Sequence, residues 1–452
     1  MIHQYKLNGF NIVLDVASGS IHRVDDLAYD VIDMYERESR VNIVSLMKEK
    51  YAGVSDNDIL EVISDVEELK SRGKLFSTDV FADAAKNADA VAAPPVKALC
   101  MNVSHTCNMV CRYCFVGHVF DQGGGELMPF ETGKMAVDFL VENSGTRKNL
   151  DIDFFGGEPL LNWDVVKEIV GYARGIEAEC GKNFRFTLTT NGLLIDDDVI
   201  NFTNREMHNI VLSLDGRPEI NDAARKFTGG GGTYADVVPK FKKLVQSRGG
   251  KGYYIRGTFT RDNLDFVNDI LHMADLGFTE LSMEPVVSKA DAPYALTADN
   301  LTELYGQYER LAAEMIKRKK EGRGFTFYHY MLNLTGGPCI YKRIAGCGAG
   351  TEYLAVTPRG ELYPCHQFVG DEGFIMGDVR RGVTNHKLRG EFDGCNIYSR
   401  AECRDCWARM YCSGGCAANA WNASGSIAGV YKLGCELFKE RVECAIMIKA
   451  AE

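Results

Sequence analysis

The first part of the chain alternates between hydrophobic and polar residues and then changes to helical spacing. YKLNGFNIVLDVASGSIHRV alternates around an Ala-Ser-Gly-Ser turn, which predicts a β-hairpin. LAYDVIDMYE and SDNDILEVISDVEELKSRGKL repeat apolar residues with helical spacing, and the second begins at a Ser55 cap and ends near Gly73. Residues 1–82 are therefore predicted to form a small unit of their own, and the Ala-rich residues 83–95, ending in Pro94-Pro95, a linker.

Short β-rich runs alternate with amphipathic helices over residues 96–310. The strand-like runs are KALCMNV, LDIDFF, FRFTLTT, NIVLSLD, GYYIRGTF and LSMEPV. Six such units predict an α/β fold with a parallel sheet curved into a partial (β/α)6 barrel. Active sites in folds of this kind lie at the carboxyl ends of the strands, so we expect the functional residues there.

A bridging segment, residues 311–345, is entered through the helical pattern LTELYGQYERLAAEMIKRKKEG. It leads to residues 346–452, which are rich in Gly and Cys and have weak periodicity. A core of this kind needs support beyond apolar packing, and metal sites are the obvious source.

Composition excludes several classes of function. The chain has 452 residues, 46% of them hydrophobic and 25% charged, which is typical of a globular protein with more than one domain. No apolar run is long enough to span a bilayer and MIHQYKLNGF has no signal-peptide core, so we expect a cytoplasmic protein without a membrane partner. The net charge of −11 disfavours nucleic acid as the main partner.

The fifteen cysteines change this picture most. None lies between Met1 and Leu99, whereas ten lie between Cys339 and Cys444. Cysteines in a cytoplasmic chain stay reduced, so this number indicates metal or redox chemistry rather than a disulfide framework.

The first group of cysteines is Cys107, Cys111 and Cys114, in HTCNMVCRYCFVG. On a helix, this spacing would place all three on one apolar face. A three-ligand zinc site completed by His105 or His118 is a second interpretation. The third, which fits best, is a 4Fe-4S cluster with one iron left open, because four cysteines normally satisfy such a cluster.

The segment CNMVCRYC resembles the cluster loop of the radical S-adenosylmethionine (SAM) enzymes. The resemblance implies that the open iron binds SAM, that the cluster reduces SAM to a 5′-deoxyadenosyl radical, and that Tyr113 lies against the adenine. The organism is then expected to be anaerobic.

Three further motifs follow the next predicted strands in the order that this family requires. GGEP, TTNG and SLDG resemble the SAM-binding motifs, and Asn221-Asp222 stands where relatives often have His-Asp, which leaves the substrate pocket in doubt. Taken singly, each motif would be an ordinary turn or cap. The resemblance implies SAM contacts from Gly156, Gly157, Glu158, Asn191, Ser213 and Arg225.

The C-terminal cysteines resemble the SPASM domain, which holds two auxiliary 4Fe-4S clusters. By this resemblance the outer cluster takes Cys403, Cys406, Cys412 and Cys435, and the inner one Cys347, Cys365 and Cys416. Cys339 precedes Cys347 by a longer gap than in sulfatase-maturing relatives; if it does not ligate, one inner iron is open to a substrate thiolate. A zinc ribbon using four of these thiols is the alternative.

The N-terminal unit resembles the PqqD-like domains, which bind leader peptides by adding a strand to a sheet edge. The whole combination resembles the thioether-forming maturases of ribosomally made peptides, and most closely those that act on SCIFF peptides. This implies a precursor peptide with a leader and a low-potential electron donor such as ferredoxin or flavodoxin. The alternatives are a sulfatase-maturing type of dehydrogenase and a zinc-ribbon protein that binds peptides without catalysis.

Overall fold

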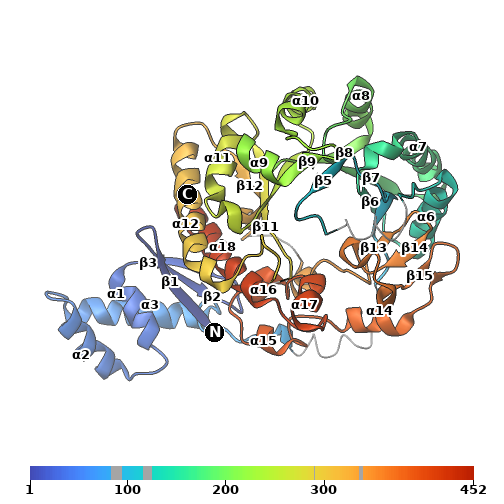
Figure 1. Cartoon of the computed structure of the whole chain (residues 1–452). Coiled ribbons are helices and arrows are strands. Elements are labelled where there is room, and N and C mark those ends of the chain that lie inside the picture. Colours follow the sequence, from blue (N-terminus) through green and yellow to red (C-terminus); the bar gives the residue numbers. More distant parts are fainter. Residues whose placement is uncertain (83–93, 116–124, 290, 335–338, 452) are drawn as a thin grey trace.

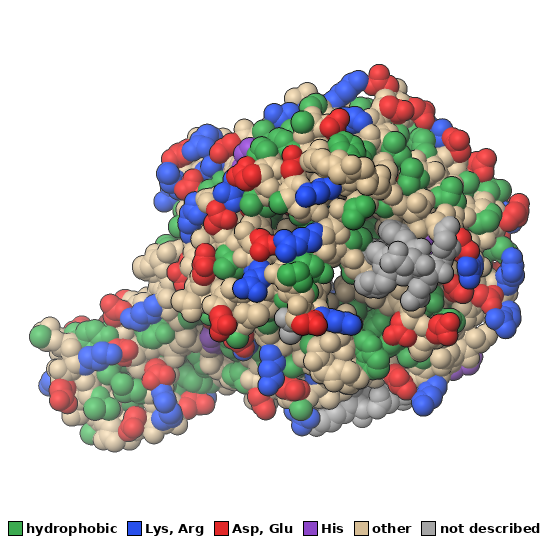
Figure 2. Space-filling model, viewed as in Figure 1, with side chains coloured by type: hydrophobic (Ala, Val, Ile, Leu, Met, Phe, Trp, Pro, Cys, Tyr) green, Lys and Arg blue, Asp and Glu red, His purple; other side chains and the backbone are tan. Residues whose placement is uncertain are grey.

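The computed structural model describes residues 1–82, 94–115, 125–289, 291–334 and 339–451 (Figure 1). Most of the predicted linker, at 83–93, lies outside these residues. A small lobe at the N-terminus projects from the rest of the molecule, and acidic and basic side chains are mixed over its visible face (Figure 2).

The N-terminal lobe contains two hairpins, so the prediction of a single hairpin was wrong. Its antiparallel sheet has the order β1 (Ile2–Leu7), β2 (Phe10–Asp15) and β3 (Ile21–Val24). Asn8 and Gly9 join β1 to β2 with φ of 48° and 81°, the left-handed conformation of a tight hairpin turn. Three helices follow: α1 (Asp26–Met34), α2 (Arg40–Lys50) and α3 (Asp56–Ser71), the last of which begins with the predicted Ser55 cap.

The centre of the molecule is the expected α/β fold. Six parallel strands lie side by side in chain order: β4 (Ala98–Ser104), β6 (Asn149–Gly156), β7 (Asn183–Thr190), β8 (Met207–Ser213), β10 (Tyr254–Phe259) and β11 (Glu280–Pro285). Their helices form an arc on the outside of the curved sheet (Figure 1): α6 (Phe130–Asn143), α7 (Trp163–Cys180), α8 (Asp197–Glu206), α10 (Tyr234–Ser247) and α11 (Phe266–Asp275).

The sheet continues beyond the six predicted strands at both edges. β12 (Thr326–Phe327) pairs with β11, while β13 (Tyr353–Val356) runs parallel to β4, with Tyr353 opposite Ala98 and Val356 opposite Met101. β14 (Glu361–Tyr363), β15 (Gly377–Asp378) and β16 (Gly382–Val383) complete an eleven-stranded sheet. The C-terminal segment is thus joined to the barrel by a backbone ladder across the predicted boundary at residue 346.

Short helices make up most of the remaining C-terminal structure. They are α13 (Ile340–Ala345), α14 (His386–Asp393), α15 (Ala401–Arg404), α16 (Arg409–Cys412) and α17 (Ala417–Ser424). The long α18 (Lys432–Ala451) packs along α12 (Leu301–Lys320), the predicted bridging helix. No helix among the described residues is long and apolar enough to cross a membrane.

The N-terminal lobe contacts the main body through β1 and α18. His3 Nε2 lies 2.8 Å from a Glu443 carboxylate oxygen, and the Tyr5 hydroxyl donates to the Glu443 backbone carbonyl at 2.9 Å. The His3 ring also stacks on Trp407, with ring centroids 3.7 Å apart. One face of the lobe's sheet is therefore packed against the C-terminal segment.

Candidate active site

The first three cysteines follow β4 at the carboxyl end of the parallel sheet, as predicted. Cys111 ends β5 (Met109–Cys111), a short strand that pairs antiparallel with β9 (Arg225–Phe227). Burial raises the pKa of Cys107 to about 12, and the charges of Glu158, Cys111 and Cys114 add to this shift. The helical interpretation of this spacing was therefore wrong, because an extended strand lies within it.

Two polar side chains approach the sulfurs of this group. Asn191 Nδ2 lies 3.6 Å from Cys107 Sγ, and Arg225 Nη1 lies 3.6 Å from Cys111 Sγ. Arg225 is 9% exposed, and its buried Nε has no hydrogen-bond partner among the described residues. A buried cation with an unused donor beside three thiols fits an anionic iron–sulfur cluster, whose sulfurs accept such hydrogen bonds.

Tyr113, between the second and third cysteines, is tied to the end of β8. Its hydroxyl donates to Asp215 Oδ2 at 2.6 Å, and the Thr258 backbone N–H donates to Asp215 Oδ1 at 3.0 Å. Burial raises the pKa of Asp215, while the charge of Arg225, 3.7 Å away, opposes this shift. The cluster loop and the SLDG motif are therefore held together by one buried acidic group.

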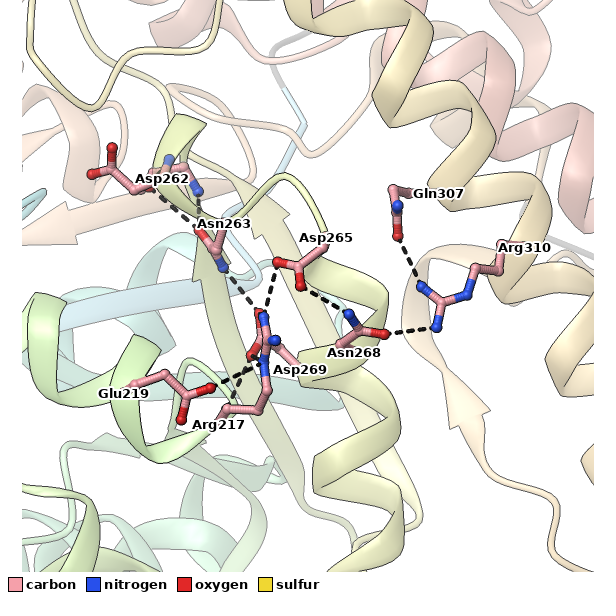
Figure 3. Close-up of polar contacts among 10 residues, drawn as sticks. Arg217, Glu219, Asp262, Asn263, Asp265, Asn268, Asp269, Gln307 and Arg310 are labelled. Carbon is pink, nitrogen blue, oxygen red and sulfur yellow. Dashed lines mark hydrogen bonds and ion pairs between the residues drawn. The ribbon is translucent and has the colours of Figure 1, made fainter.

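A second polar network joins the turn after the SLDG motif to the start of α11 (Figure 3). Arg217 donates from its backbone N–H and from Nε to Asp269 Oδ1, at 3.0 and 2.7 Å, and from Nη2 to Asp265 at 2.9 Å. Gly216 has φ of 121°, and a Cβ there would lie 2.2 Å from the Asp269 Cβ. The network holds the loop that follows Ser213 against α11.

The GGEP motif requires its first glycine for a steric reason. Gly156 has φ of 124°, and a Cβ on it would lie 2.3 Å from the Ser104 carbonyl oxygen. The same oxygen accepts a 2.8 Å hydrogen bond from Gly157 N–H. This close approach of β4 and β6 places Gly156 and Gly157 on the wall of the cavity described below.

Glu158 lies behind this wall rather than on it. It is fully buried; Oε1 accepts from the Thr190 hydroxyl at 2.8 Å and Oε2 from the Asn191 N–H at 2.8 Å. Burial raises its pKa to about 7. In this arrangement Glu158 positions Asn191, and its predicted contact with SAM stays a prediction.

The C-terminal cysteines lie near enough to one another to shift each other's pKa, and their division into two clusters stays a prediction. Burial raises the pKa of Cys365 to about 12, with contributions from Cys416 and Cys347. Burial likewise raises the pKa of Cys412 to about 12, with contributions from the other three predicted outer ligands: Cys435, Cys403 and Cys406. Cys339 is exposed at the start of α13, and its role as an inner ligand stays open.

Arg400 lies between these two groups. Its Nη2 donates to the Ile427 carbonyl at 2.8 Å and lies 3.3 Å from Cys395 Sγ, while its buried Nε has no partner within the described ranges. Its charge acts to lower the pKa of both Cys403 and Cys416. A buried cation between two groups of thiols again fits anionic clusters.

The zinc alternatives gain no support from the geometry. Across the described parts of the chain, no three His, Cys, Asp or Glu side chains converge closely enough to hold one metal ion. A cubane cluster distributes its thiolates over four irons, so its ligands stand further apart than those of a single zinc.

One cavity of about 1560 Å³ connects the barrel with the C-terminal segment. Cysteines from both parts of the chain line it, together with residues of the three predicted SAM-binding motifs at the strand ends and Arg225. These lining residues include Cys107, Cys111, Tyr113, Cys114, Gly156, Gly157, Asn191, Ser213, Arg225, Cys347, Cys365, Cys412, Cys416 and Cys435.

Several lining residues were not predicted from the sequence. Arg256 on β10 and Glu284 on β11 face the cavity from within the barrel, and His366 and Arg441 face it from the C-terminal segment. The sequence did contain a signal for the first two, because they are charged residues inside strands with buried neighbours.

Residues 101–271 match the model of the radical SAM superfamily. The matched residues run from β4 to α11 and so contain the first three cysteines and the strand-end motifs.

Similarity extends beyond this domain. The radical SAM cyclopropyl synthase TigE of Paramaledivibacter caminithermalis is 23% identical over 76% of this chain and 72% of its own length. A serine-type anaerobic sulfatase-maturating enzyme of Klebsiella aerogenes is 24% identical over 74% and 82%. The solved structure of native anSMEcpe with bound AdoMet and Cp18Cys peptide has a TM-score of 0.64 at 22% identity, covering 79% of this chain and 99% of that chain. At this identity the structural likeness shows the fold alone.

Proposed function

We propose that this chain forms thioether crosslinks between a cysteine sulfur and an acceptor carbon in a ribosomally made, cysteine-rich precursor peptide, as the SCIFF maturases do. The observation that carries the proposal is the shared cavity. Two groups of three cysteines, at the barrel mouth and in the C-terminal segment, line one space large enough for a peptide. The peptide bound in the anSMEcpe structure and the maturase names among the relatives support a peptide substrate.

The cofactors would be held by the three groups of cysteines. Cys107, Cys111 and Cys114 would hold the SAM-binding cluster, and the other two groups the auxiliary clusters. When bound, SAM and its cluster would supply the 5′-deoxyadenosyl radical, which abstracts a hydrogen atom from a substrate carbon. The auxiliary clusters would supply an iron site for a cysteine thiolate and an acceptor for the surplus electron. A ferredoxin or flavodoxin type of protein is the proposed electron donor.

Aromatic side chains line the wall between the two groups of cysteines. The His366 ring lies 5.0 Å from that of Phe155 and 5.8 Å from that of Phe115. Burial lowers the pKa of His366 to about 4, so its imidazole is neutral at physiological pH. This aromatic part of the wall carries no charge and would help to keep water from the space in which a radical would react.

The N-terminal lobe is proposed to bind the leader at β3. This edge strand is half-buried or exposed throughout, whereas β1, at the other edge, contains the buried Tyr5 and Leu7. Hydrogen exchange tests this assignment. Residues 21–24 should gain protection when the full precursor is added and not when a leaderless peptide is added, while α2 stays unchanged. Protection at α2 instead would reject strand addition.

The function is tested by anaerobic reconstitution with SAM, dithionite and the cysteine-rich peptide encoded beside this chain. Mass spectrometry should show loss of two hydrogens for each crosslink and a thiol that no longer reacts with an alkylating reagent. Loss of two hydrogens with every thiol still reactive would favour the sulfatase-maturing type of dehydrogenase. Zinc without iron and sulfide in the purified protein would reject both enzymes.

A further inference from the structure

Arg256 carries a charge into the inside of the barrel. It lies in the middle of β10, opposite Ser213 on β8 and Ser282 on β11. Its side chain is exposed and lines the cavity, although both neighbours in its strand, Ile255 and Gly257, are buried. Its guanidinium makes no hydrogen bond or ion pair among the described residues, although its charge acts on the nearby carboxylate of Glu284.

Glu284 faces the cavity from the neighbouring strand. It lies two residues beyond Ser282 and therefore on the same face of the sheet. Its side chain is 35% exposed; His329 Nε2 lies 3.4 Å from one carboxylate oxygen, and Arg441 Nη1 lies 3.8 Å from the other. The second distance is too long for a hydrogen bond. Burial would raise the pKa of Glu284, but His329, Arg441 and Arg256 hold it below its ordinary value, which places both arginines near this carboxylate.

Arg441 reaches the same place from α18. Its side chain is only 11% exposed, and its buried Nε and Nη1 have no hydrogen-bond partner in the part of the chain that the structure describes. Leaving charged donors buried without an acceptor costs stability. Two of the three guanidinium nitrogens therefore have no hydrogen-bond acceptor among the described residues.

The charges in this wall do not balance. Arg256 and Arg441 contribute two positive charges and Glu284 one negative charge. Burial lowers the pKa of His329 to about 4, so this histidine is neutral at physiological pH. Among these four side chains one positive charge is therefore left over, and it faces the cavity.

We propose that Arg256 and Arg441 form an anion subsite that holds a carboxylate of the peptide substrate beside Glu284. A guanidinium binds a carboxylate through paired N–H donors, which fixes direction as well as affinity. The carboxylate is an Asp or Glu side chain or the peptide's C-terminus. That the ligand is a peptide rests on the proposed function; the subsite would fix which residue of the peptide lies between the two groups of cysteines.

Two other anions could occupy or neutralise this pair of arginines, and the experiment must distinguish them from the peptide carboxylate. Ser213, a predicted SAM contact, is opposite Arg256, so the carboxylate of SAM is one. Arg441 also acts to lower the pKa of Cys412, so an outer cluster is the other.

The experiment measures binding of the fluorescently labelled precursor to the reconstituted full chain under anaerobic conditions, without reductant. The probes are the parent peptide, variants with each core Asp or Glu changed singly to Asn or Gln, and a C-terminal amide. The protein variants are Arg256→Gln, Arg256→Lys and Arg441→Gln, with the exposed Arg380→Gln as the matched control. SAM affinity and iron content are measured on every variant.

Arg256→Gln is expected to weaken binding of the parent peptide by about 10- to 100-fold, with SAM affinity and iron content unchanged. One peptide variant should bind the parent protein as weakly as the parent peptide binds Arg256→Gln. The same variant should bind Arg256→Gln no more weakly still. Which variant behaves in this way tells whether the bound carboxylate is a particular side chain or the C-terminus of the peptide. Arg256→Lys should recover part of the loss, and Arg380→Gln should bind normally.

The inference is overturned if Arg256→Gln binds every peptide as the parent does, or if it weakens SAM binding instead. It is also overturned if Arg441→Gln loses iron while Arg256→Gln binds peptide normally. Arg441 would then act at the outer cluster and not in a peptide subsite. A parent protein that shows the expected coupling but makes no crosslink would contradict the proposed function and leave the subsite standing.

Discussion

The Tyr113 hydroxyl donates a 2.6 Å hydrogen bond to the buried carboxylate of Asp215. It joins the loop of the first three cysteines to the end of β8, two positions that are 102 residues apart in the chain. The same carboxylate faces Arg225, whose Nη1 approaches Cys111. The geometry of the cysteine loop therefore depends on residues far from it in sequence.

Replacing Asp215 by Asn should destabilise the protein. The change removes the negative charge beside the buried Arg225, and breaking a buried charge pair in this way costs about 3–5 kcal/mol. Thermal unfolding of the reconstituted protein should show the loss as a lower midpoint. Tyr113→Phe, which removes one hydrogen bond and no charge, should cost only about 1 kcal/mol. Equal midpoints for Asp215→Asn and the parent would mean that this carboxylate is not the counter-ion of Arg225.

Cys111→Ala should abolish SAM cleavage and lower the iron content by roughly a third, since one of three proposed clusters is lost. Iron and sulfide analysis and the yield of 5′-deoxyadenosine measure the two effects. The control is Cys180→Ala, on α7 and outside all three groups, which should behave as the parent. SAM cleavage that survives in Cys111→Ala contradicts the role of this loop.

Cys347→Ala should separate the two reactions. The radical site is untouched, so SAM cleavage should continue, whereas the proposed thiolate site is damaged and crosslinked peptide should disappear. Both products can be followed in one mass-spectrometric assay. A variant that still makes the full amount of crosslink shows that the inner group of cysteines does not bind the substrate sulfur.

Gly156→Ala should destabilise the fold by about 2–4 kcal/mol, because its Cβ would collide with the Ser104 carbonyl and its φ of 124° disfavours any side chain. Gly171→Ala is the matched control. Gly171 lies within α7 with nothing within 4 Å of a Cβ, so this change should stabilise the helix by about 0.5–1 kcal/mol. Chemical denaturation distinguishes the two, and a neutral Gly156→Ala would contradict the steric argument.

Glu440 should make stability depend on pH. Burial, with Glu443 nearby, raises its pKa from 4.5 to about 7. The folded state therefore holds this proton more tightly than the unfolded state, and the free energy of unfolding should fall as the pH rises from about 4.5 to 7. Glu440→Gln should reduce this slope in unfolding midpoints measured from pH 5 to 8. The control is Glu303→Gln, an exposed residue on α12, which should keep the parent's dependence of the unfolding midpoint on pH. An unchanged pH dependence in Glu440→Gln would mean that Glu440 does not cause it.

The parallel strands could be predicted because their residues alternate or run apolar between clear helices, as in LDIDFF and FRFTLTT. The cysteine groups could be assigned because their spacing resembles known motifs. The Asn8-Gly9 turn was missed because the later Ala-Ser-Gly-Ser turn dominated the interpretation of that segment. Strands β13 to β16 carry no strong periodicity, since two of the four have only two residues and their pairing depends on β4, far away in sequence. Arg256 and Glu284 stand out in the sequence as charged residues inside strands, but their place in the cavity could not be predicted, because the closed sheet decides which face of a strand lines a cavity.

The pairing of β13 with β4 has a mechanical consequence. β4 leads directly into the first three cysteines, and β13 lies between Cys347 and Cys365, so a hydrogen-bonded ladder connects both groups without a hinge. Backbone hydrogen bonds within one sheet therefore fix where the loops that carry the two groups leave it. Under the proposed function, a peptide in the cavity would have to match the spacing of these loops, so the strand pairing would limit which of its residues a crosslink can join.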